Sequence, residues 1–405
     1  MNYKITPPKS ISGKIKLPSS KSICNRALII NALSDSPYPI ENLSDCDDTR
    51  AVVGVLNSDG KHFDVGAAGT AMRFLTAFLS KIVGEWTITG SERMKNRPIR
   101  ILVDALNSLG AKIEYTEKEG FPPLRIFGSA LQGGEIELDG SVSSQYLSAL
   151  LMVAPTMQRG LIIHLKDKVA SKPYIFMTLK LMEDFGVKSV WTGGKISVPA
   201  QEYKQIPFCV ESDWSAAAYW YEILALKGEG EIFLEGLQRK SYQGDAAVAD
   251  LFANLGVNTA FEKDGVRLTT TEKIVSPMIY NFVEQPDLAQ TFVVTCCLLN
   301  IPFSFRGLET LKIKETDRVA ALIAEMRKIG YILKETPEGA LEWQGDKIAP
   351  EETPIIRTYE DHRMAMSFAP TALKIDNLYI AEPQVVTKSY PNFWEDLRCV
   401  GFGVK

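Results

Sequence analysis

Cationic side chains gather where several helices are predicted to begin. Arg26 follows Ser22 by four residues and shares its helix face, while Arg318 and Arg363 follow the segments KETD and YEDH at the starts of two later helices. The helix macrodipole makes an arginine in a first turn unfavourable by roughly 0.3–1 kcal/mol at exposed sites. An anion bound between the free N–H groups and the arginine removes this cost. The pattern therefore predicts binding of small anionic ligands.

The same regions also have purely structural interpretations. A single arginine is commonly solvated or paired with a nearby carboxylate. Ser143 or Ser144 in SVSSQYLSALL, Asp213 in ESDWSAAAY and Asp287 in EQPDLAQTF are natural helix N-caps. Alternatively, two adjacent serines followed by a glutamine would present hydroxyl groups and an amide to a phosphate. The recurrence of cations at several equivalent helix starts favours anion binding.

Acid and base candidates lie beside two of the arginines. Lys314 and Glu315 precede Arg318 in IKETDRV, and His362 directly precedes Arg363 in DHRMAM. Lysine, carboxylate and imidazole groups can all transfer protons to a substrate held within hydrogen-bond reach. The sequence thus places possible proton donors and acceptors next to possible anion-binding groups.

Several other kinds of chemistry are disfavoured. Neither a P-loop nor a GxGxxG segment follows a predicted strand, so the usual nucleotide-binding motifs are missing. The three histidines are not spaced as metal ligands, and His164 in LIIHLKD is predicted to lie in the core of a strand. The net charge of -4 gives no bulk attraction for nucleic acid, so an anion must be bound by a local cluster of cations.

The cysteines and the apolar segments indicate a cytoplasmic protein. Six cysteines are present without C-x-x-C spacing, which predicts reduced thiols in the core. The start of the chain, MNYKITPPKSISG, has no apolar signal-peptide region, and runs such as YLSALLMVAP are too short to span a bilayer. We therefore expect neither secretion nor membrane insertion.

The elements that position these residues follow a repeat. Segments such as RILVDALNSLGAKIEYTEKEG and AVADLFANLGVNTAFEKDGVRLT each predict an amphipathic helix, a glycine that ends it, and two strands joined by a turn. A second set of more apolar helices alternates with the first at a period of about 70 residues, as in stacked supersecondary units. The predicted unit is strand, helix, strand, helix, strand, strand, and it occurs six times.

The six units divide into two predicted domains within the 405 residues. Three consecutive units occupy residues 19–212, and the remaining units occupy residues 213–405. The opening segment NYKITPPKSISGKIKLP is most easily placed as a strand of the second half, so residues 1–18 are assigned to that domain. The chain is therefore expected to cross between the domains twice.

Taken together, the motifs resemble those of the 5-enolpyruvylshikimate-3-phosphate (EPSP) synthase family over essentially the whole chain. In order they are LPSSKSICNRAL, GTAMRFL, ERMKNRPI, SVSSQYLSALLMVAP, ASKPYI, KETDR, DHRMAM and VVTKSYPNFWEDL. The resemblance implies an α/β fold of two inverse α/β barrels, each with three βαβαββ repeats, whose helix N-termini face an interdomain cleft. It also implies transfer of the enolpyruvyl group of phosphoenolpyruvate to the 5-hydroxyl of shikimate 3-phosphate, releasing phosphate, without a metal or organic cofactor.

The resemblance also assigns roles to individual residues. Those expected to bind shikimate 3-phosphate are Lys21, Ser22, Arg26, Ser143, Ser144, Gln145, Ser171, Tyr174, Asp287 and Lys314. Those expected to bind phosphoenolpyruvate are Lys21, Gly69, Arg97, Gln145, Arg318, Arg363 and Lys388. The expected catalytic residues are Lys21, Asp287, Glu315 and His362. Asp287 would accept the proton of the 5-hydroxyl, and Glu315 would act as acid and base at the methylene carbon.

Four positions depart from the common family pattern. Ala67 replaces an asparagine and Phe74 a proline near GTAMR, while Thr310 replaces an asparagine and Lys312 an arginine near KETDR. These positions are expected to influence affinity for both substrates and the response to glyphosate, an inhibitor of the phosphoenolpyruvate site in the family.

Rival functions share parts of the pattern. UDP-N-acetylglucosamine enolpyruvyl transferase has the same architecture, but it would show Lys-Asn in place of Lys21-Ser22 and a reactive cysteine in the loop that here reads ERMKNRPI. A non-catalytic protein that binds phosphorylated metabolites would not require the acid and base residues, and an RNA-end-processing relative conflicts with the acidic balance. The sequence therefore predicts a monomeric, cytoplasmic carboxyvinyltransferase of the shikimate pathway, which leads to chorismate and the aromatic amino acids, with no nucleic-acid or membrane partner.

Overall fold

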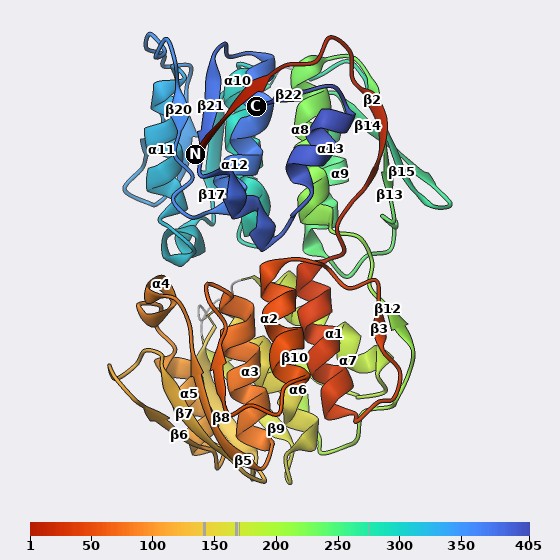
Figure 1. Ribbon diagram of the computed structural model, residues 1–405, viewed down its shortest axis with the longest axis vertical. Helices are drawn as coiled ribbons and strands as arrows, with labels where there is room; N and C mark the ends of the chain where they lie inside the picture. The colour runs from red at the N-terminus through yellow and green to blue at the C-terminus, as the bar shows by residue number, and fades with distance from the viewer. Residues whose placement is uncertain (141–142, 167–168, 170, 275) are drawn as a thin grey trace. The chain divides into compact units, whose positions relative to one another are not determined.

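The chain forms two compact units (Figure 1). The computed structural model describes residues 1–140, 143–166, 169, 171–274 and 276–405. Unit 1 comprises Met1–Pro18 and Glu211–Lys405, and unit 2 comprises Ser19–Val210. The chain thus leaves unit 1 after its first strands and returns to it after completing unit 2.

The sheets repeat one pattern, in which two parallel strands are followed by two antiparallel ones. In unit 1 the strand order of the first sheet is β2 (Ser12–Lys16), β13 (Glu231–Glu235), β15 (Gly265–Thr270), β14 (Val257–Glu262). The order of the second sheet is β16 (Met278–Asn281), β17 (Phe303–Arg306), β19 (Leu341–Trp343), β18 (Lys334–Glu335). The order of the third sheet is β20 (Ile355–Ile356), β21 (Leu378–Ala381), β1 (Asn2–Thr6), β22 (Gly403–Val404). In unit 2 they are β4 (His62–Asp64), β5 (Gly84–Thr89), β7 (Leu124–Gly128), β6 (Lys112–Tyr115); β8 (Gly134–Asp139), β9 (Leu161–Lys166), β11 (Lys195–Val198), β10 (Val190–Thr192); and the parallel pair β3 (Ile40–Glu41), β12 (Phe208–Cys209). The predicted strand–helix–strand–helix–strand–strand pattern is confirmed in the five four-stranded sheets, whereas the sixth sheet of the described residues has only the pair β3 and β12.

The opening segment contributes two strands rather than the single strand expected. β1 pairs antiparallel with β21 and β22, and β2 pairs parallel with β13. The segment between them, with Pro7 and Pro8, lacks the donors that a continuous strand would need. Both strands complete sheets of unit 1.

Two sets of helices alternate along the chain. The inner set comprises α1 (Lys21–Leu33), α3 (Gly69–Lys81), α6 (Ser144–Val153), α8 (Trp214–Lys227), α10 (Ala289–Leu298) and α12 (His362–Phe368). The outer set comprises α2 (Asp47–Leu56), α5 (Arg100–Ser108), α7 (Lys172–Asp184), α9 (Val248–Ala253), α11 (Arg318–Lys328) and α13 (Phe393–Cys399), and the short α4 (Glu92–Lys95) precedes α5. Every residue of α10 and of α12 is buried, as expected of a helix surrounded by protein on all sides.

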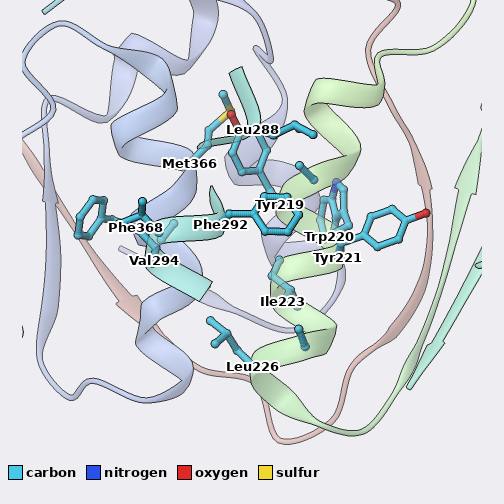
Figure 2. Packing of buried hydrophobic residues seen from close by; sticks show 14 of the residues in the cluster. Tyr219, Trp220, Tyr221, Ile223, Leu226, Leu288, Phe292, Val294, Met366 and Phe368 are labelled. Atoms are coloured by element: carbon cyan, nitrogen blue, oxygen red, sulfur yellow. The ribbon is translucent and has the colours of Figure 1, made fainter. Parts of the chain in front are cut away.

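The inner helices pack on one another and form the core of each unit. Figure 2 shows side chains of α8, α10 and α12, including Tyr219, Phe292 and Met366, filling the space between these three helices in unit 1. In unit 2, α6 packs against both α1 and α3. Strands such as β9 alternate buried and more exposed residues, so one face of each sheet covers the helices and the other faces solvent. This arrangement places helices inside and sheets outside.

Some expectations about buried side chains were wrong. Four of the cysteines are buried, but Cys209 and Cys399 are exposed. His164 lies on the outward face of β9, with 43% of its side chain exposed and Nε2 3.1 Å from Oε2 of Glu135. The alternation of a strand with one solvated face explains the position of His164. No helix in the described part of the chain is long and apolar enough to cross a membrane.

A glutamate lies inside the core of unit 1. Glu222 belongs to α8 and is fully buried, and its carboxyl group faces Thr295 of α10. Burial raises the pKa of Glu222 well above its ordinary value, and neither carboxyl oxygen has a hydrogen-bond partner among the described residues. At pH values between the unfolded and the folded pKa of Glu222, the folded protein therefore retains a proton that the unfolded chain releases.

Replacing this carboxyl group should change how stability depends on pH. A carboxyl group with a raised pKa in the folded state adds stability at pH values below its unfolded pKa, and this contribution falls as pH rises toward the folded pKa. Between pH 5 and pH 8, we expect the wild type to lose about 1–4 kcal/mol more unfolding free energy than Glu222→Gln, measured by urea denaturation. Glu229→Gln, at an exposed site, should behave as wild type. Parallel pH curves for Glu222→Gln and wild type would contradict the assignment.

Candidate functional site

The first inner helix of unit 2 begins with two of the predicted binding residues. Lys21 is the first residue of α1, is partly buried, and places Nζ 4.0 Å from Oδ2 of the buried Asp48. Ser22 follows, and its carbonyl oxygen accepts a hydrogen bond of 2.9 Å from Nη1 of Arg26. The first two turns of α1 thus carry the partly buried cation Lys21 and the buried cation Arg26.

Arg26 is a buried cation surrounded by neutral groups. Nε donates to Oγ1 of Thr178 at 2.7 Å, and Nη2 donates to Oγ of Ser148 at 2.9 Å. The guanidinium group lies 5.2 Å from the ring centroid of Phe74, and Nη2 is 3.4 Å from the carbonyl oxygen of Tyr174. Burial lowers the pKa of Arg26 to about 10, and no described carboxylate forms an ion pair with it. A buried cation without a counter-ion is costly, which fits a site that receives an anion.

The start of α3 and the loop after α4 carry the next pair of predicted residues. Gly69 opens α3, and a Cβ atom there would lie 2.5 Å from Nη1 of Arg97, so the arginine lies directly against the glycine. Arg73 donates to the carbonyl oxygens of Gly69 at 3.2 Å and Pro98 at 3.3 Å. The hydroxyl group of Tyr146 also donates to Pro98. Arg73 and Tyr146 therefore fix the loop that carries Arg97.

The start of α6 combines a cap with an exposed amide. Ser143 is the N-cap of α6, and its hydroxyl group accepts a hydrogen bond of 3.3 Å from the backbone N–H of Gln145. Ser144 is the first helical residue and is partly exposed. The side chain of Gln145 donates to Oγ1 of Thr70 on α3 at 3.3 Å. The N-cap interpretation is confirmed for Ser143, and the hydroxyl group of Ser144 lies at the same helix start.

A left-handed residue precedes α7. Ser171 has φ 53° and ψ 40°, is buried, and makes no side-chain cap to the helix that follows. For a residue other than glycine this conformation costs about 1–3 kcal/mol and is typical of functional sites. Tyr174, in the first turn of α7, accepts from Arg26 through its carbonyl oxygen. Arg26 and Gln145 thus bring the starts of α1, α3, α6 and α7 together in unit 2.

In unit 1, Arg318 binds three carboxylates. Nε donates to Oδ2 of Asp361 at 2.6 Å, Nη1 to Oδ1 of Asp287 at 3.1 Å, and Nη2 to Oε2 of Glu315 at 3.0 Å. Burial lowers the pKa of Arg318, but the three carboxylates outweigh burial and raise the pKa above its ordinary value. The guanidinium group is therefore a permanent positive charge inside the unit.

Two further cations complete this network. Nη2 of Arg363 lies 2.9 Å from Oδ2 of Asp287, and Nζ of Lys388 lies 2.9 Å from Oε1 of Glu315. Arg363 also donates to the hydroxyl oxygen of Tyr219 at 3.4 Å. Each of the two carboxylates predicted to be catalytic therefore bridges two cations that were predicted to bind phosphoenolpyruvate.

The N-cap alternative for Asp287 is wrong. Asp287 lies in the 3-10 turn η3 (Pro286–Leu288), α10 starts after Leu288 with Leu288 as its N-cap, and the carboxylate of Asp287 forms ion pairs with Arg318 and Arg363. Asp213, by contrast, caps α8 by accepting from the backbone N–H of Ser215 at 2.8 Å. The 3-10 turn that begins at Pro286 precedes the α-helix and contains Asp287, which a reading of the sequence alone did not resolve.

The remaining predicted residues of unit 1 surround the same network. Lys314 follows the turn η4 (Glu309–Ile313) and is partly buried, and desolvation lowers its pKa although Asp287 opposes the change. His362 is the first residue of α12, is buried, and places Nδ1 3.8 Å from Oδ1 of Asp361. Lys314 and His362 are therefore ionisable groups near the carboxylates of this network.

Two residues of these networks were not among the predicted site residues. Asp361 is the N-cap of α12, accepting from the N–H of Arg363 at 2.9 Å while its carboxylate binds Arg318. Arg73 joins the loops of Gly69 and Pro98 in unit 2. An acidic residue directly before a helix that starts with His-Arg was a usable signal for Asp361. The role of Arg73 depends on contacts between loops that the sequence pattern does not specify.

Three of the departing positions have distinct surroundings. Ala67 is exposed in the turn before α3. Lys312 forms an ion pair with Glu335 and takes no part in the carboxylate–arginine network. The hydroxyl oxygen of Thr310 is buried without a hydrogen-bond partner among the described residues.

Within the described ranges, no three His, Cys, Asp or Glu side chains are grouped so that they could hold a metal ion. The helix starts carry arginines, lysines, hydroxyl groups and amides besides the capping aspartates, and these groups are suited to binding phosphate and carboxylate groups.

The fold and these residues define an α/β-repeat protein with cationic, hydroxyl and amide groups at the starts of its buried helices. The family model for EPSP synthase (3-phosphoshikimate 1-carboxyvinyltransferase) matches residues 5–62 and 53–397. The 3-phosphoshikimate 1-carboxyvinyltransferase of Bacteroides fragilis is 55% identical over 406 residues, covering 100% of this chain and 99% of the relative. That of Aliivibrio fischeri is 36% identical over 430 residues, covering 97% and 98%. The chain belongs to the EPSP synthase family.

A solved structure supports the fold independently of close sequence similarity. The EPSP synthase from Acinetobacter baumannii aligns with a TM-score of 0.79 over 100% of this chain and 99% of its own, at 19% identity. At this level of identity the similarity bears on the fold, and it agrees with the inverse α/β barrel implied by the family resemblance.

A methyl group at Gly69 should weaken binding of phosphoenolpyruvate. Because the Cβ atom of Gly69→Ala would lie against the guanidinium group of Arg97, the arginine must move from its present position. We expect KM for phosphoenolpyruvate to rise about tenfold, with KM for shikimate 3-phosphate changed less than about twofold, in steady-state assays. Gly54→Ala, where a Cβ atom meets nothing within 4 Å, is the matched control. An unchanged KM for phosphoenolpyruvate would place Arg97 outside that site.

Loss of the aromatic ring at Phe74 should weaken binding of shikimate 3-phosphate. The ring faces the guanidinium group of Arg26, and a cation–π contact of this kind stabilises by about 0.5–2 kcal/mol. Calorimetric titration should show a Kd for shikimate 3-phosphate about 2- to 30-fold higher in Phe74→Leu. Phe78→Leu, one turn further along α3, should bind as wild type. Equal affinities in Phe74→Leu and wild type would show that the ring does not support Arg26.

Proposed function

We propose that this chain transfers the enolpyruvyl group of phosphoenolpyruvate to the 5-hydroxyl of shikimate 3-phosphate, giving 5-enolpyruvylshikimate 3-phosphate and phosphate. The observation that carries the mechanism is the bridging of Asp287 and Glu315 by Arg318, Arg363 and Lys388. Two carboxylates and several cations in one network supply both proton transfer and anion binding.

The unit 2 residues bind the permanent anions of shikimate 3-phosphate. Arg26, buried and without a carboxylate partner, receives the substrate carboxylate. The hydroxyl groups of Ser143, Ser144 and Ser171 at the starts of α6 and α7 receive the phosphate, where free N–H groups add to the attraction. The other proposed contacts come from Lys21, Ser22, Gln145, Tyr174, Asp287 and Lys314. A charged group bound in a partly buried site is held in one orientation, which positions the 5-hydroxyl group.

Phosphoenolpyruvate binds to cations that the free protein satisfies internally. Its phosphate and carboxylate compete with Glu315 for Lys388 and Arg318 and with Asp287 for Arg363. In unit 2 the proposed contacts are Lys21, Gly69, Arg97 and Gln145. Binding therefore releases the two carboxylates from part of their ion pairing. A carboxylate that loses a cation and gains a neighbouring anion takes up a proton more readily.

The released carboxylates then carry out addition and elimination. Asp287 accepts the proton of the 5-hydroxyl group as its oxygen attacks C2 of phosphoenolpyruvate, while Glu315 protonates the methylene carbon. In the second step Glu315 removes a proton from the new methyl group, and phosphate leaves with its charge balanced by the lysines and arginines. Lys21 and His362 are proposed to assist proton transfer. Each proton transfer in the two steps thus has an acceptor or a donor among the carboxylates of the network.

We also propose that the enzyme is a cytoplasmic monomer that requires neither metal nor organic cofactor and binds neither nucleic acid nor membrane. Light scattering of the purified protein at assay concentration tests the monomer, and activity after treatment with EDTA tests the metal requirement. A dimer mass or loss of activity after chelation would overturn the respective statement.

Phosphate release tests the proposed reaction. Purified protein with phosphoenolpyruvate should release phosphate when shikimate 3-phosphate is added and not when UDP-N-acetylglucosamine is added. Release with the nucleotide sugar instead would identify the sister transferase, and silence with both acceptors in a folded sample would favour a non-catalytic binding protein.

The variant Asp287→Asn tests the proposed base. It should retain Kd for shikimate 3-phosphate within a few-fold and lose about 10²- to 10⁴-fold in kcat, because the amide cannot accept the hydroxyl proton. Asp317→Asn, which alters the N-cap of α11 outside the network, should keep most of the activity. Full turnover by Asp287→Asn would remove Asp287 from catalysis.

A further inference from the structure

A buried carboxyl group outside the predicted site lies close to the network of unit 1. Asp245 belongs to the 3-10 turn η2 (Gly244–Ala247) that precedes α9, and only 4% of the residue is exposed. Its Oδ2 accepts a hydrogen bond from the hydroxyl group of Ser215 in the first turn of α8. No motif in the sequence distinguished this aspartate.

One face of α8 connects Asp245 to Asp287. Ser215 and Tyr219 are four residues apart on α8 and therefore lie one above the other. Ser215 binds Asp245, and the hydroxyl oxygen of Tyr219 accepts from Nη1 of Arg363, whose Nη2 lies 2.9 Å from Asp287. The turns that carry Asp245 and Asp287 both pack on α8.

The position of η2 on α8 is fixed by a glutamine. Oε1 of Gln243 accepts from the backbone N–H of Trp214 at 2.9 Å, and Nε2 of Gln243 donates to the carbonyl oxygen of Ser212 at 2.8 Å. Two hydrogen bonds from one buried side chain hold the loop against the helix start. Asp245 therefore keeps its place relative to the α8 face that contacts Arg363.

The charges around Asp245 place its titration in the working pH range. Burial raises the pKa of Asp245 to about 7, with Asp287 and Asp213 adding to the rise and Arg363 and the Ser215 hydrogen bond opposing it. Tyr280 on β16 is a further titratable group within its influence.

We propose that Asp245 is a positioning residue for the reaction: its carboxyl group shares the positive charge of Arg363 with Asp287 and thereby controls how strongly Asp287 attracts a proton. When Asp245 is neutral, Arg363 acts fully on Asp287 and weakens it as a base. When Asp245 is ionised, its negative charge offsets Arg363, and Asp287 becomes a stronger base. The inference rests on the proposed role of Asp287 as the acceptor of the 5-hydroxyl proton.

The pH dependence of kcat tests this inference. With both substrates saturating, kcat of the wild type should rise as pH increases through about 7, whereas Asp245→Asn should lack this rise. The ratio of wild-type to variant kcat should be close to one at pH 6 and about three to ten at pH 8. Damage to the fold alone would lower kcat of the variant equally at both pH values, and that result would overturn the proposal.

Two further variants keep the test decisive. Ser215→Ala removes the hydrogen bond that favours ionised Asp245, so the rise in kcat should move to higher pH; an unmoved profile would contradict the proposal even if Asp245→Asn fails to fold. Asp250→Asn, at an exposed position on α9, is the matched control and should follow the wild-type profile. If the wild type releases no phosphate with shikimate 3-phosphate at any pH, the proposed function fails, an outcome distinct from a pH-independent ratio.

Discussion

The ion pairs of Arg318 are the interaction on which unit 1 depends. One buried guanidinium group binds carboxylates from η3, from the loop after η4, and from the residue that caps α12. Removing one partner from such a network leaves an unpaired buried charge, which is strongly destabilising. The same contacts that hold four chain segments together therefore also hold Asp287 and Glu315 in place.

The two units differ in whether their buried cations are paired with carboxylates. In unit 1 the cations Arg318, Arg363 and Lys388 are paired with carboxylates, so an incoming anion must compete for them. In unit 2, Arg26 is buried among hydroxyl groups, a carbonyl oxygen and an aromatic ring, with no described carboxylate as partner. An anion bound to Arg26 supplies a missing counter-ion, whereas an anion bound in unit 1 replaces an existing one. Only the second kind of binding frees acid and base groups.

The inverse arrangement of the fold explains why these groups lie at helix starts. The inner helices are buried along their length, so only their ends can meet a ligand. A sheet on the outside cannot offer such ends. The starts of α1, α6 and α12 therefore coincide with residues that we propose to bind anions. The αL conformation of Ser171 before α7 is a local strain retained at the same kind of position.

Signals between neighbouring residues were sufficient to predict the repeats and helices of this fold from the sequence. Hydrophobic periodicity and helix-ending glycines predicted the six repeats and the inner helices, because these signals act over a few neighbouring residues. The family was indicated by the resemblance of its motifs. Tertiary structure decided which charges meet. Arg318 and Asp361 are 43 positions apart and Arg26 and Thr178 are 152 apart, so their pairing depends on how repeats pack. For this reason Asp287 was equally compatible with an N-cap, Phe74 was seen only as a departure, and Asp361 and Asp245 were not recognised as members of the network.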